Sequence, residues 1–223
     1  MTRLLMLVEG QSEEVFVKRT LAPYLAERQV YVQPPIVLWT KRLASGGGYR
    51  GGVSDWNQIR RSLNPLTRDS DAWVTTLLDL YGLPEDFPGY REAHEPGDAR
   101  QRVATLQQSF MEAIGHPRFV PFLALHEFEA WVFAGPDVVA DHFSTPGLAA
   151  RVRQASQQAG NPELIDLGDS SHPKARLQGM NTGYKQSADG PTLLEKIGID
   201  AIRRACPHFA GWLKRLEALG EAT

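Results

Sequence analysis

The feature that most constrains the fold is a short apolar run near the start of the chain that ends in an acidic turn. Residues 4–8 read Leu-Leu-Met-Leu-Val, and Glu9 and Gly10 follow directly. An apolar run of this length is typical of a strand buried on both faces, as in a parallel sheet. Open α/β sheets bind ligands at the carboxyl ends of their strands, where Glu9 would lie. The run therefore predicts a buried strand that delivers a carboxylate to a ligand-binding edge.

Strand and helix patterns alternate over the first 134 residues. Apolar runs predict further strands over residues 36–40, 72–78 and 119–125. Amphipathic patterns predict helices over residues 13–28, 54–63 and 98–114, capped by Ser12, by Ser54 or Asp55, and by Asp98. This alternation predicts an α/β fold with a mostly parallel sheet flanked by helices.

The remainder of the chain lacks a convincing strand pattern. Helical segments are predicted over residues 137–142, 147–159, 191–204 and 208–218, separated by Pro and Gly. We therefore predict two regions, an α/β core over residues 1–134 and a helical C-terminal region over residues 135–223 that packs on the core.

Composition indicates the cellular compartment that is expected for the protein. The chain has 223 residues, a net charge of −2 and one cysteine, Cys206, so no disulfide framework is expected. No apolar run approaches the roughly 20 residues that span a bilayer, and the N-terminus lacks a signal-peptide pattern. We expect a cytoplasmic protein without a membrane partner. Cys206, Trp131, Phe209 and Trp212 are expected to be core residues.

Acidic residues follow three of the predicted strands. Glu9 follows the first strand, Asp79 follows residues 72–78, and the pair Glu127 and Glu129 follows residues 119–125. The carboxyl ends of parallel strands meet at one edge, so these side chains are expected to converge. Converging carboxylates repel one another unless a divalent cation lies between them, and oxygen ligands without a zinc-type His/Cys cluster favour Mg²⁺ or Mn²⁺. The pattern predicts a metal site suited to phosphodiester chemistry; the alternative is that these acids only cap helices.

The position of the third acidic pair depends on where its helix begins. If the segment is extended, Glu127 and Glu129 share a face, whereas in a helix they point roughly 200° apart. We retain both as candidate metal ligands and catalytic residues. His126 is a weaker candidate for a base or for a partner of a metal-bound carboxylate.

Two motifs resemble those of Toprim domains, the metal-binding fold of topoisomerases, primases and overcoming-lysogenization-defect nucleases. The first is the strand followed by Glu9-Gly-Gln-Ser-Glu, and the second is Asp79-Leu-Tyr, at the place of an Asp-x-Asp motif. The whole chain resembles the Toprim-like DUF4276 family through Val-Glu-Gly at 8–10, Asp-Leu-Tyr-Gly-Leu-Pro at 79–84, His-Glu-Phe-Glu-Ala-Trp at 126–131 and Cys-Pro-His-Phe at 206–209.

This resemblance implies specific roles for the acidic residues. Glu9 would be a metal ligand or general acid/base, and Asp79 a metal ligand in a nuclease that acts with Mg²⁺ or Mn²⁺, with a partner ATPase in phage defence. Tyr81 departs from the pattern because it replaces the second Asp and is a poor Mg²⁺ ligand. Either Glu127 or Glu129 then supplies that ligand, or the site binds metal weakly.

Basic side chains offer candidate contacts to nucleic acid. Residues 41–68 contain six basic residues and one acid, Asp55. Arg50 in the glycine-rich segment 45–52, and Lys174, Arg176 and Lys185 further on, are candidate phosphate-binding residues. The alternative is that these charges lie on a solvated surface.

Three functions fit these patterns. The first is a metal-dependent nuclease, acting on DNA or RNA. The second is a degenerate Toprim module that binds a partner ATPase or nucleic acid without cleavage, as Tyr81 allows. The third is a phosphoesterase for nucleotides or small phosphates. The oligomeric state and the choice between DNA and RNA stay open.

Overall fold

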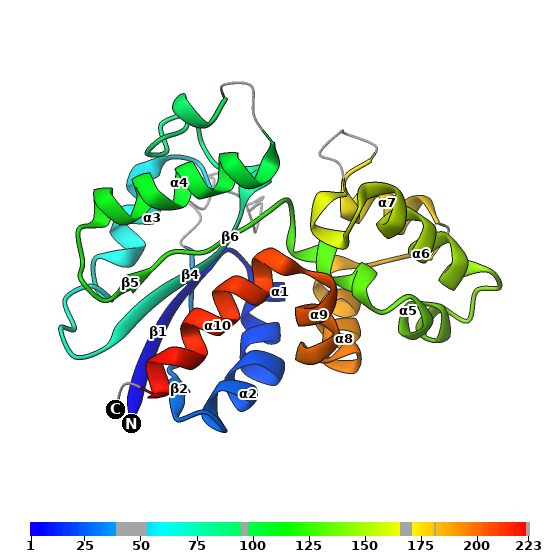
Figure 1. The fold of residues 1–223 in the computed structure, drawn as a ribbon, viewed down its shortest axis with the longest axis horizontal. Helices are drawn as coiled ribbons and strands as arrows, with labels where there is room; N and C mark the ends of the chain where they lie inside the picture. Colours follow the sequence, from blue (N-terminus) through cyan, green and yellow to red (C-terminus); the bar gives the residue numbers. More distant parts are fainter. Residues whose placement is uncertain (39–52, 95–97, 166–170, 181, 222–223) are drawn as a thin grey trace, which may run out of the picture.

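A parallel sheet lies at the centre of the computed structural model, which describes residues 1–38, 53–94, 98–165, 171–180 and 182–221 (Figure 1). Its main strand order is β2-β1-β4-β5, and every pairing is parallel. The strands are β1 (Thr2–Val8), β2 (Val30–Val32), β3 (Ile36–Val37), β4 (Trp73–Asp79), β5 (Phe119–Val120) and β6 (Leu123–Ala124). β2 and then β3 pair with one side of β1, and β5 and then β6 pair with the outer side of β4. The predicted α/β fold with a mostly parallel sheet is confirmed.

Apolar side chains on the two faces of the sheet belong to two separate cores. Along β1, Leu4, Met6 and Val8 point into one core and Leu7 into the other, because neighbouring side chains in a strand alternate between faces. Burial on both faces explains why residues 4–8 are uniformly apolar.

The smaller core lies against α3 (Trp56–Leu63) and α4 (Ala99–Ile114). Asp55 and Asp98 cap these helices by accepting hydrogen bonds from the backbone N–H groups of Gln58 and Gln101, as predicted. Short helical turns η2 (Leu80–Gly82) and η3 (Glu92–His94) lie between β4 and α4.

The larger core contains the first helical segment and the C-terminal helices. The first segment is α1 (Gln11–Phe16), the π-helical turn η1 (Val17–Leu21) and α2 (Ala22–Ala26). The others are η4 (Phe128–Ala134), α5 (Pro136–Phe143), α6 (Leu148–Ala159), η5 (Pro162–Leu164), α7 (Pro173–Gly179), α8 (Gln186–Ile197), α9 (Ile199–Ala205) and α10 (Pro207–Glu221). The boundary between regions at residue 134 stays a prediction.

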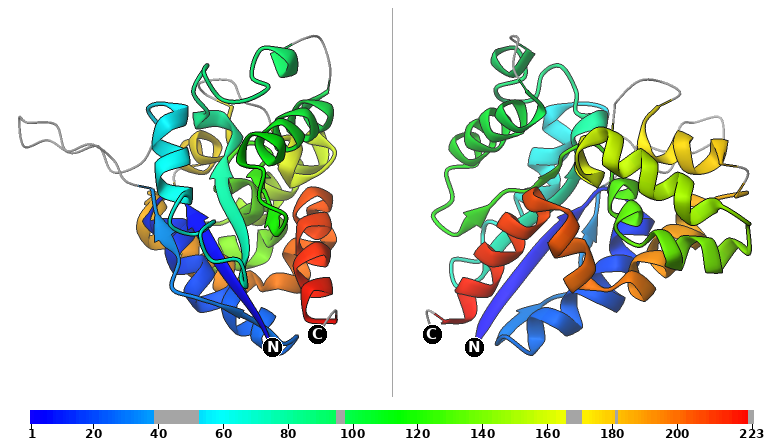
Figure 2. Two further views of the ribbon diagram at one scale, coloured as in Figure 1. Left: turned by 90° about the vertical axis from the view of Figure 1, so that its left-hand side faces the viewer. Right: turned by 45° about the vertical axis from the view of Figure 1, so that its right-hand side comes forward.

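Helix α10 packs along the sheet, so the last described helix lies beside the first strand (Figures 1 and 2). The Trp212 indole N–H donates to the Thr75 hydroxyl at 3.0 Å, and the Thr2 hydroxyl donates to the carbonyl of Leu219 at 2.9 Å. Trp131, Phe209, Trp212 and Cys206 are buried, as predicted.

Several predicted boundaries were wrong. The strand over residues 119–125 is divided because Pro121 has no N–H to donate to the ladder. The Thr76 hydroxyl fills the gap, donating to the Phe122 carbonyl and accepting from the Phe122 N–H. The prediction also missed β2. Residues 39–40 of the strand predicted over 36–40 lie outside the described residues.

The predicted helix ends also need correction. Ser12 does not cap the first helix: it lies inside α1, and its hydroxyl donates to the Gln186 carbonyl at 3.4 Å. The helix predicted over residues 191–204 begins at Gln186 and is divided at Gly198, whose φ of 78° is left-handed. Within the described residues, no helix is long and apolar enough to cross a membrane.

Candidate active site

The carboxyl ends of β1 and β4 bring Glu9 and Asp79 together. The pairing of Val8 with Leu77 places Glu9, the residue after β1, beside the end of β4, whose last residue is Asp79. Glu9 Oε2 accepts a hydrogen bond from the Asp79 backbone N–H at 2.8 Å. Asp79 Oδ1 accepts one from the Phe128 N–H at 3.0 Å, where η4 begins. Backbone groups therefore fix both carboxylates at the predicted ligand-binding edge.

Glu13 adds a carboxylate that the sequence analysis did not single out for the site. It lies in the first turn of α1 and is only 3% exposed. Its Oε2 atom is so close to Gly10 that a Cβ built there would lie 3.1 Å away. Glycine at the strand-to-helix turn therefore leaves room for the Glu13 carboxylate. The spacing Glu9-x-x-x-Glu13 was the available signal.

Both glutamates of the third pair reach the same region. Glu127 precedes η4 with extended backbone, and its Oε2 atom lies 3.0 Å from His172 Nδ1 and accepts the Lys174 backbone N–H at 3.2 Å. Glu129 lies inside η4 and is 1% exposed; its Oε1 atom accepts from the Tyr184 hydroxyl at 3.4 Å. The tight turns of η4 thus bring the pair to one site.

Burial, together with repulsion between neighbouring carboxylates, raises the pKa of Glu9, Glu13 and Glu129. Burial raises the pKa of Glu9 to about 7, outweighing the hydrogen bond from Asp79, and the charges of Glu13 and Glu127 raise it further. Burial likewise raises the pKa of Glu129 to about 8, helped by Glu127 and Glu13. The pKa of Glu13 is also raised by burial.

Asp79 is at the electrostatic centre of the group. Its pKa is raised well above the ordinary value, first by burial and then by the charges of Glu9, Glu13, Glu129 and Glu127, in that order. All five carboxylates therefore interact across one small region. We name these five residues the carboxylate cluster.

The donor chemistry of the carboxylate cluster fits a hard divalent cation. Carboxylate oxygens are the ligands that Mg²⁺ and Mn²⁺ prefer, and a cation would offset the repulsion that raises these pKa values. Within the described residues, Glu129 Oε2 is buried without a hydrogen-bond partner. Among the described residues, no three or more Asp, Glu, His or Cys side chains are already arranged around a single ion position. Binding of a cation by the carboxylate cluster would therefore require side-chain rotation.

Tyr81, the departure from the Asp-x-Asp pattern, lies beside this group. Its ring stacks on the ring of His172 with centroids 5.7 Å apart and planes 18° apart. His172 in turn contacts Glu127. Sequence reasoning did not assign a role to His172 or to Tyr184, because both reach the cluster from loops distant in the chain.

The predicted phosphate-binding residues separate in the structure. Lys174 lies at the site: its Nζ donates to the Gln186 side chain at 3.0 Å, and its charge lowers the pKa of Glu129. Arg176, also in α7, donates through Nε to the Ser171 carbonyl. Lys185 is exposed, and its backbone N–H donates to Asp189. Arg50 lies outside the described residues.

The weaker candidate, His126, is buried immediately before the acidic pair. Its carbonyl accepts the Tyr81 backbone N–H at 3.2 Å and so joins the turn after β4 to the segment that carries Glu127. Through this backbone contact, His126 helps to position the two segments that form the site.

Comparison with known protein families shows to which family the chain belongs. The family described as "Domain of unknown function (DUF4276)" matches residues 8–217, nearly the whole chain. The chain belongs to the DUF4276 family. The resemblance predicted from the sequence is thereby confirmed. The search of curated proteins gives no match for this DUF4276 protein.

Solved structures similar to the DUF4276 protein at a low level include C-terminal regions of OLD proteins. The C-terminal region of the Burkholderia pseudomallei OLD protein has 15% identity and a TM-score of 0.45, with 99% of each chain covered. Two structures of the C-terminal region of the Xanthomonas campestris pv. campestris OLD protein have 15% and 17% identity and TM-scores of 0.33 and 0.35. They cover 96% of this chain and 97% and 95% of theirs. At these values we infer no function from the likeness.

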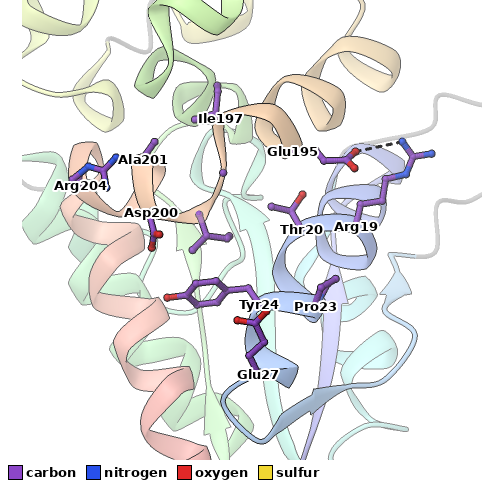
Figure 3. Close-up of a pocket in the computed structure, with 12 residues that line it drawn as sticks. Arg19, Thr20, Pro23, Tyr24, Glu27, Glu195, Ile197, Asp200, Ala201 and Arg204 are labelled. Atoms are coloured by element: carbon purple, nitrogen blue, oxygen red, sulfur yellow. Dashed lines mark ion pairs between the residues drawn. The ribbon is translucent and has the colours of Figure 1, made fainter.

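A surface pocket of about 410 Å³ lies elsewhere in the DUF4276 protein, between the first helical segment and the joint of α8 with α9 (Figure 3). Arg19 and Glu195 form an exposed ion pair at 3.8 Å at one end, and Arg204 lies at the other. The charge of Arg19 is thus already opposed by that of Glu195. The carboxylate cluster is therefore the stronger candidate site.

Proposed function

We propose that this DUF4276 protein is a Toprim-like, Mg²⁺- or Mn²⁺-dependent nuclease or phosphodiesterase that acts on nucleic acid. The observation that carries the proposal is the convergence of four glutamates with Asp79 at the carboxyl edge of a parallel sheet. Such a group does not stabilise the fold by itself, because each buried carboxylate raises the free-energy cost of ionising its neighbours. Binding of a divalent cation would offset this cost.

Each member of the cluster has a place in this proposal. Asp79 and Glu9 would hold the metal, with Glu127 or Glu129 completing the ligand set and Glu9 also able to accept a proton. When bound, a divalent ion polarises a phosphate oxygen and lowers the pKa of bound water. His172 holds Glu127 in position, and Tyr184 does the same for Glu129.

Lys174 would complement these acids by binding the substrate phosphate. Its backbone N–H donates to the Glu127 carboxylate, and its ammonium group donates to the Gln186 side chain. The positive charge of Lys174 also lowers the pKa of Glu129. A cation in this position would offset phosphate charge. The resemblance to the first Toprim motif, which contains Glu9, and to the second, which begins at Asp79, supports the same assignment.

Tyr81 favours a second candidate function, in which the protein binds its partner or nucleic acid without cleavage. Tyr81 occupies the place of the second Asp of the motif, and its ring is engaged with His172. The rival proposal is a catalytically degenerate Toprim module that binds a partner ATPase or nucleic acid without cleaving it. A role in phage defence with such an ATPase belongs to either proposal.

The test is cleavage of labelled DNA and RNA by the purified protein in Mn²⁺ or Mg²⁺. We expect wild type to cleave at least one of them and both Glu9→Gln and Asp79→Asn to lose cleavage while keeping the fold. Exposed Glu85→Gln is the matched control. Unchanged cleavage in the double variant would contradict the proposal, and a wild type that binds metal and nucleic acid without cleavage would favour the rival. Hydrolysis of a mononucleotide ester alone would identify a small-molecule phosphoesterase.

A further inference from the structure

Tyr81 presents an exposed aromatic ring next to the carboxylate cluster. It lies in η2, two residues after Asp79. Its neighbours face inward, since Leu80 is buried and a Cβ at Gly82 would lie 3.4 Å from Glu9 Oε1. Tyr81 itself is 50% exposed. The chain therefore turns this ring outward at the edge where the candidate chemistry takes place.

Protein contacts hold the ring in one orientation. The Tyr81 backbone N–H donates to the carbonyl of His126 at 3.2 Å. The ring lies nearly parallel to His172, with 18° between the planes. His172 is itself held by Glu127, so the ring is linked to the carboxylate cluster through two contacts. A flat aromatic surface is thus prepared before any ligand arrives, which lowers the entropic cost of binding.

Such exposure is unusual for a large apolar side chain in this protein. Among the described residues, the other exposed large hydrophobic side chains are Met1, the first residue, and Ile36 in the short strand β3, which is less exposed than Tyr81. An exposed aromatic face next to a phosphodiester site matches the chemistry of a nucleobase. Bases stack on aromatic side chains with little dependence on base identity, because every base has a π-face.

We propose that Tyr81 stacks on an unpaired nucleobase adjacent to the phosphate that the carboxylate cluster binds. The substrate would then be single-stranded nucleic acid or an unpaired strand end, because a base inside a duplex is covered on both faces by its neighbours. This inference rests on the proposed phosphodiesterase function and names its substrate class. Tyr81 is the specificity-determining residue.

The test is binding of an oligonucleotide that carries 2-aminopurine, whose fluorescence falls when it stacks on an aromatic ring. The full-length protein is titrated in Ca²⁺, and cleavage in Mn²⁺ is measured separately. For Tyr81→Ala we expect roughly 5- to 150-fold weaker binding of the single strand and loss of the quenching. Tyr81→Phe retains both, since the ring is kept. Tyr31→Ala, at the opposite end of the sheet in β2, is the matched control.

The outcomes separate this inference from the function on which it rests. Single-strand binding and quenching by Tyr81→Ala equal to wild type, in a protein that cleaves nucleic acid, would overturn the role of Tyr81 alone. Tighter wild-type binding to the matched duplex would also overturn it. Tyr81-dependent quenching in a protein that never cleaves would support the stacking and overturn the phosphodiesterase function.

Discussion

Glu9 Oε2 accepts a hydrogen bond from the backbone N–H of Asp79 at 2.8 Å, which joins the ends of β1 and β4 through the two residues most important to the proposed site. The bond uses one oxygen of Glu9. Asp79 in turn uses Oδ1 to accept the Phe128 N–H, which joins the same site to the segment after β6. Three chain segments are therefore fixed relative to one another by the carboxylates themselves.

A divalent cation should stabilise the protein more at pH 8 than at pH 5. The pKa of Glu9 is raised to about 7 and that of Glu129 to about 8, so at pH 5 bound protons compete with the cation. At saturating Mn²⁺ and pH 8 we expect the melting temperature to rise by about 5 °C or more. Thermal unfolding with Mn²⁺ or EDTA at both pH values measures this. An equal or larger rise at pH 5 would contradict it.

Glu129→Gln should stabilise the metal-free protein at high pH. The folded-state pKa of Glu129 is raised from 4.5 to about 8 by burial, so the stability associated with its bound proton is present below about 4.5 and lost as the pH rises through about 8. Gln removes that loss and still accepts from Tyr184. We expect a gain on the order of a few kcal/mol at pH 9 and little change at pH 4.5. Urea unfolding in EDTA measures it, with Glu85→Gln as control.

His172→Ala should impair activity through Glu127. The variant removes the ring that holds the Glu127 carboxylate at 3.0 Å, and partners of metal ligands typically contribute 10- to 100-fold. We expect kcat/KM for cleavage to fall by about that factor while the melting temperature in EDTA changes little. His116→Ala, two residues after the end of α4, is the control. Cleavage at the wild-type rate by His172→Ala would exclude this role.

Glu163 is a buried acid that we assign to the fold rather than to the site. Its carboxylate accepts the backbone N–H groups of His208 and Phe209 at 2.8 and 2.9 Å, at the beginning of α10. These groups would otherwise be unsatisfied. We expect Glu163→Ala to lower the free energy of unfolding by about 2–4 kcal/mol without loss of metal binding. Denaturant unfolding and Mn²⁺ titration of the same variant check both statements.

The sequence predicted best what depends on local pattern. The uniform apolarity of residues 4–8 follows from burial on both faces. Asp98 was predicted as a cap, and Asp55 as one of two candidates with Ser54, because capping needs only nearby backbone. The convergence of Glu9 and Asp79 was predictable because parallel strands end at one edge.

Contacts made by the C-terminal helices and their connecting segments were not predictable from pattern. His172 and Tyr184 reach Glu127 and Glu129 only after the C-terminal helices pack on the sheet. Ser12 has the residue type of a helix cap, but its hydroxyl bonds to the carbonyl of Gln186. In each case tertiary packing determines the hydrogen-bond partner of the side chain, and local sequence propensity does not predict tertiary packing.

Calorimetric titration of the purified protein with Mn²⁺ at pH 8 tests the central claim most directly. The carboxylate cluster as a cation site predicts saturable binding by wild type, a loss of affinity of tenfold or more in Asp79→Asn and Glu9→Gln, and unchanged binding by Glu85→Gln. Folding of each variant is checked by circular dichroism. Absence of saturable binding by wild type, or equal binding by wild type and the folded Asp79→Asn variant, would contradict the claim.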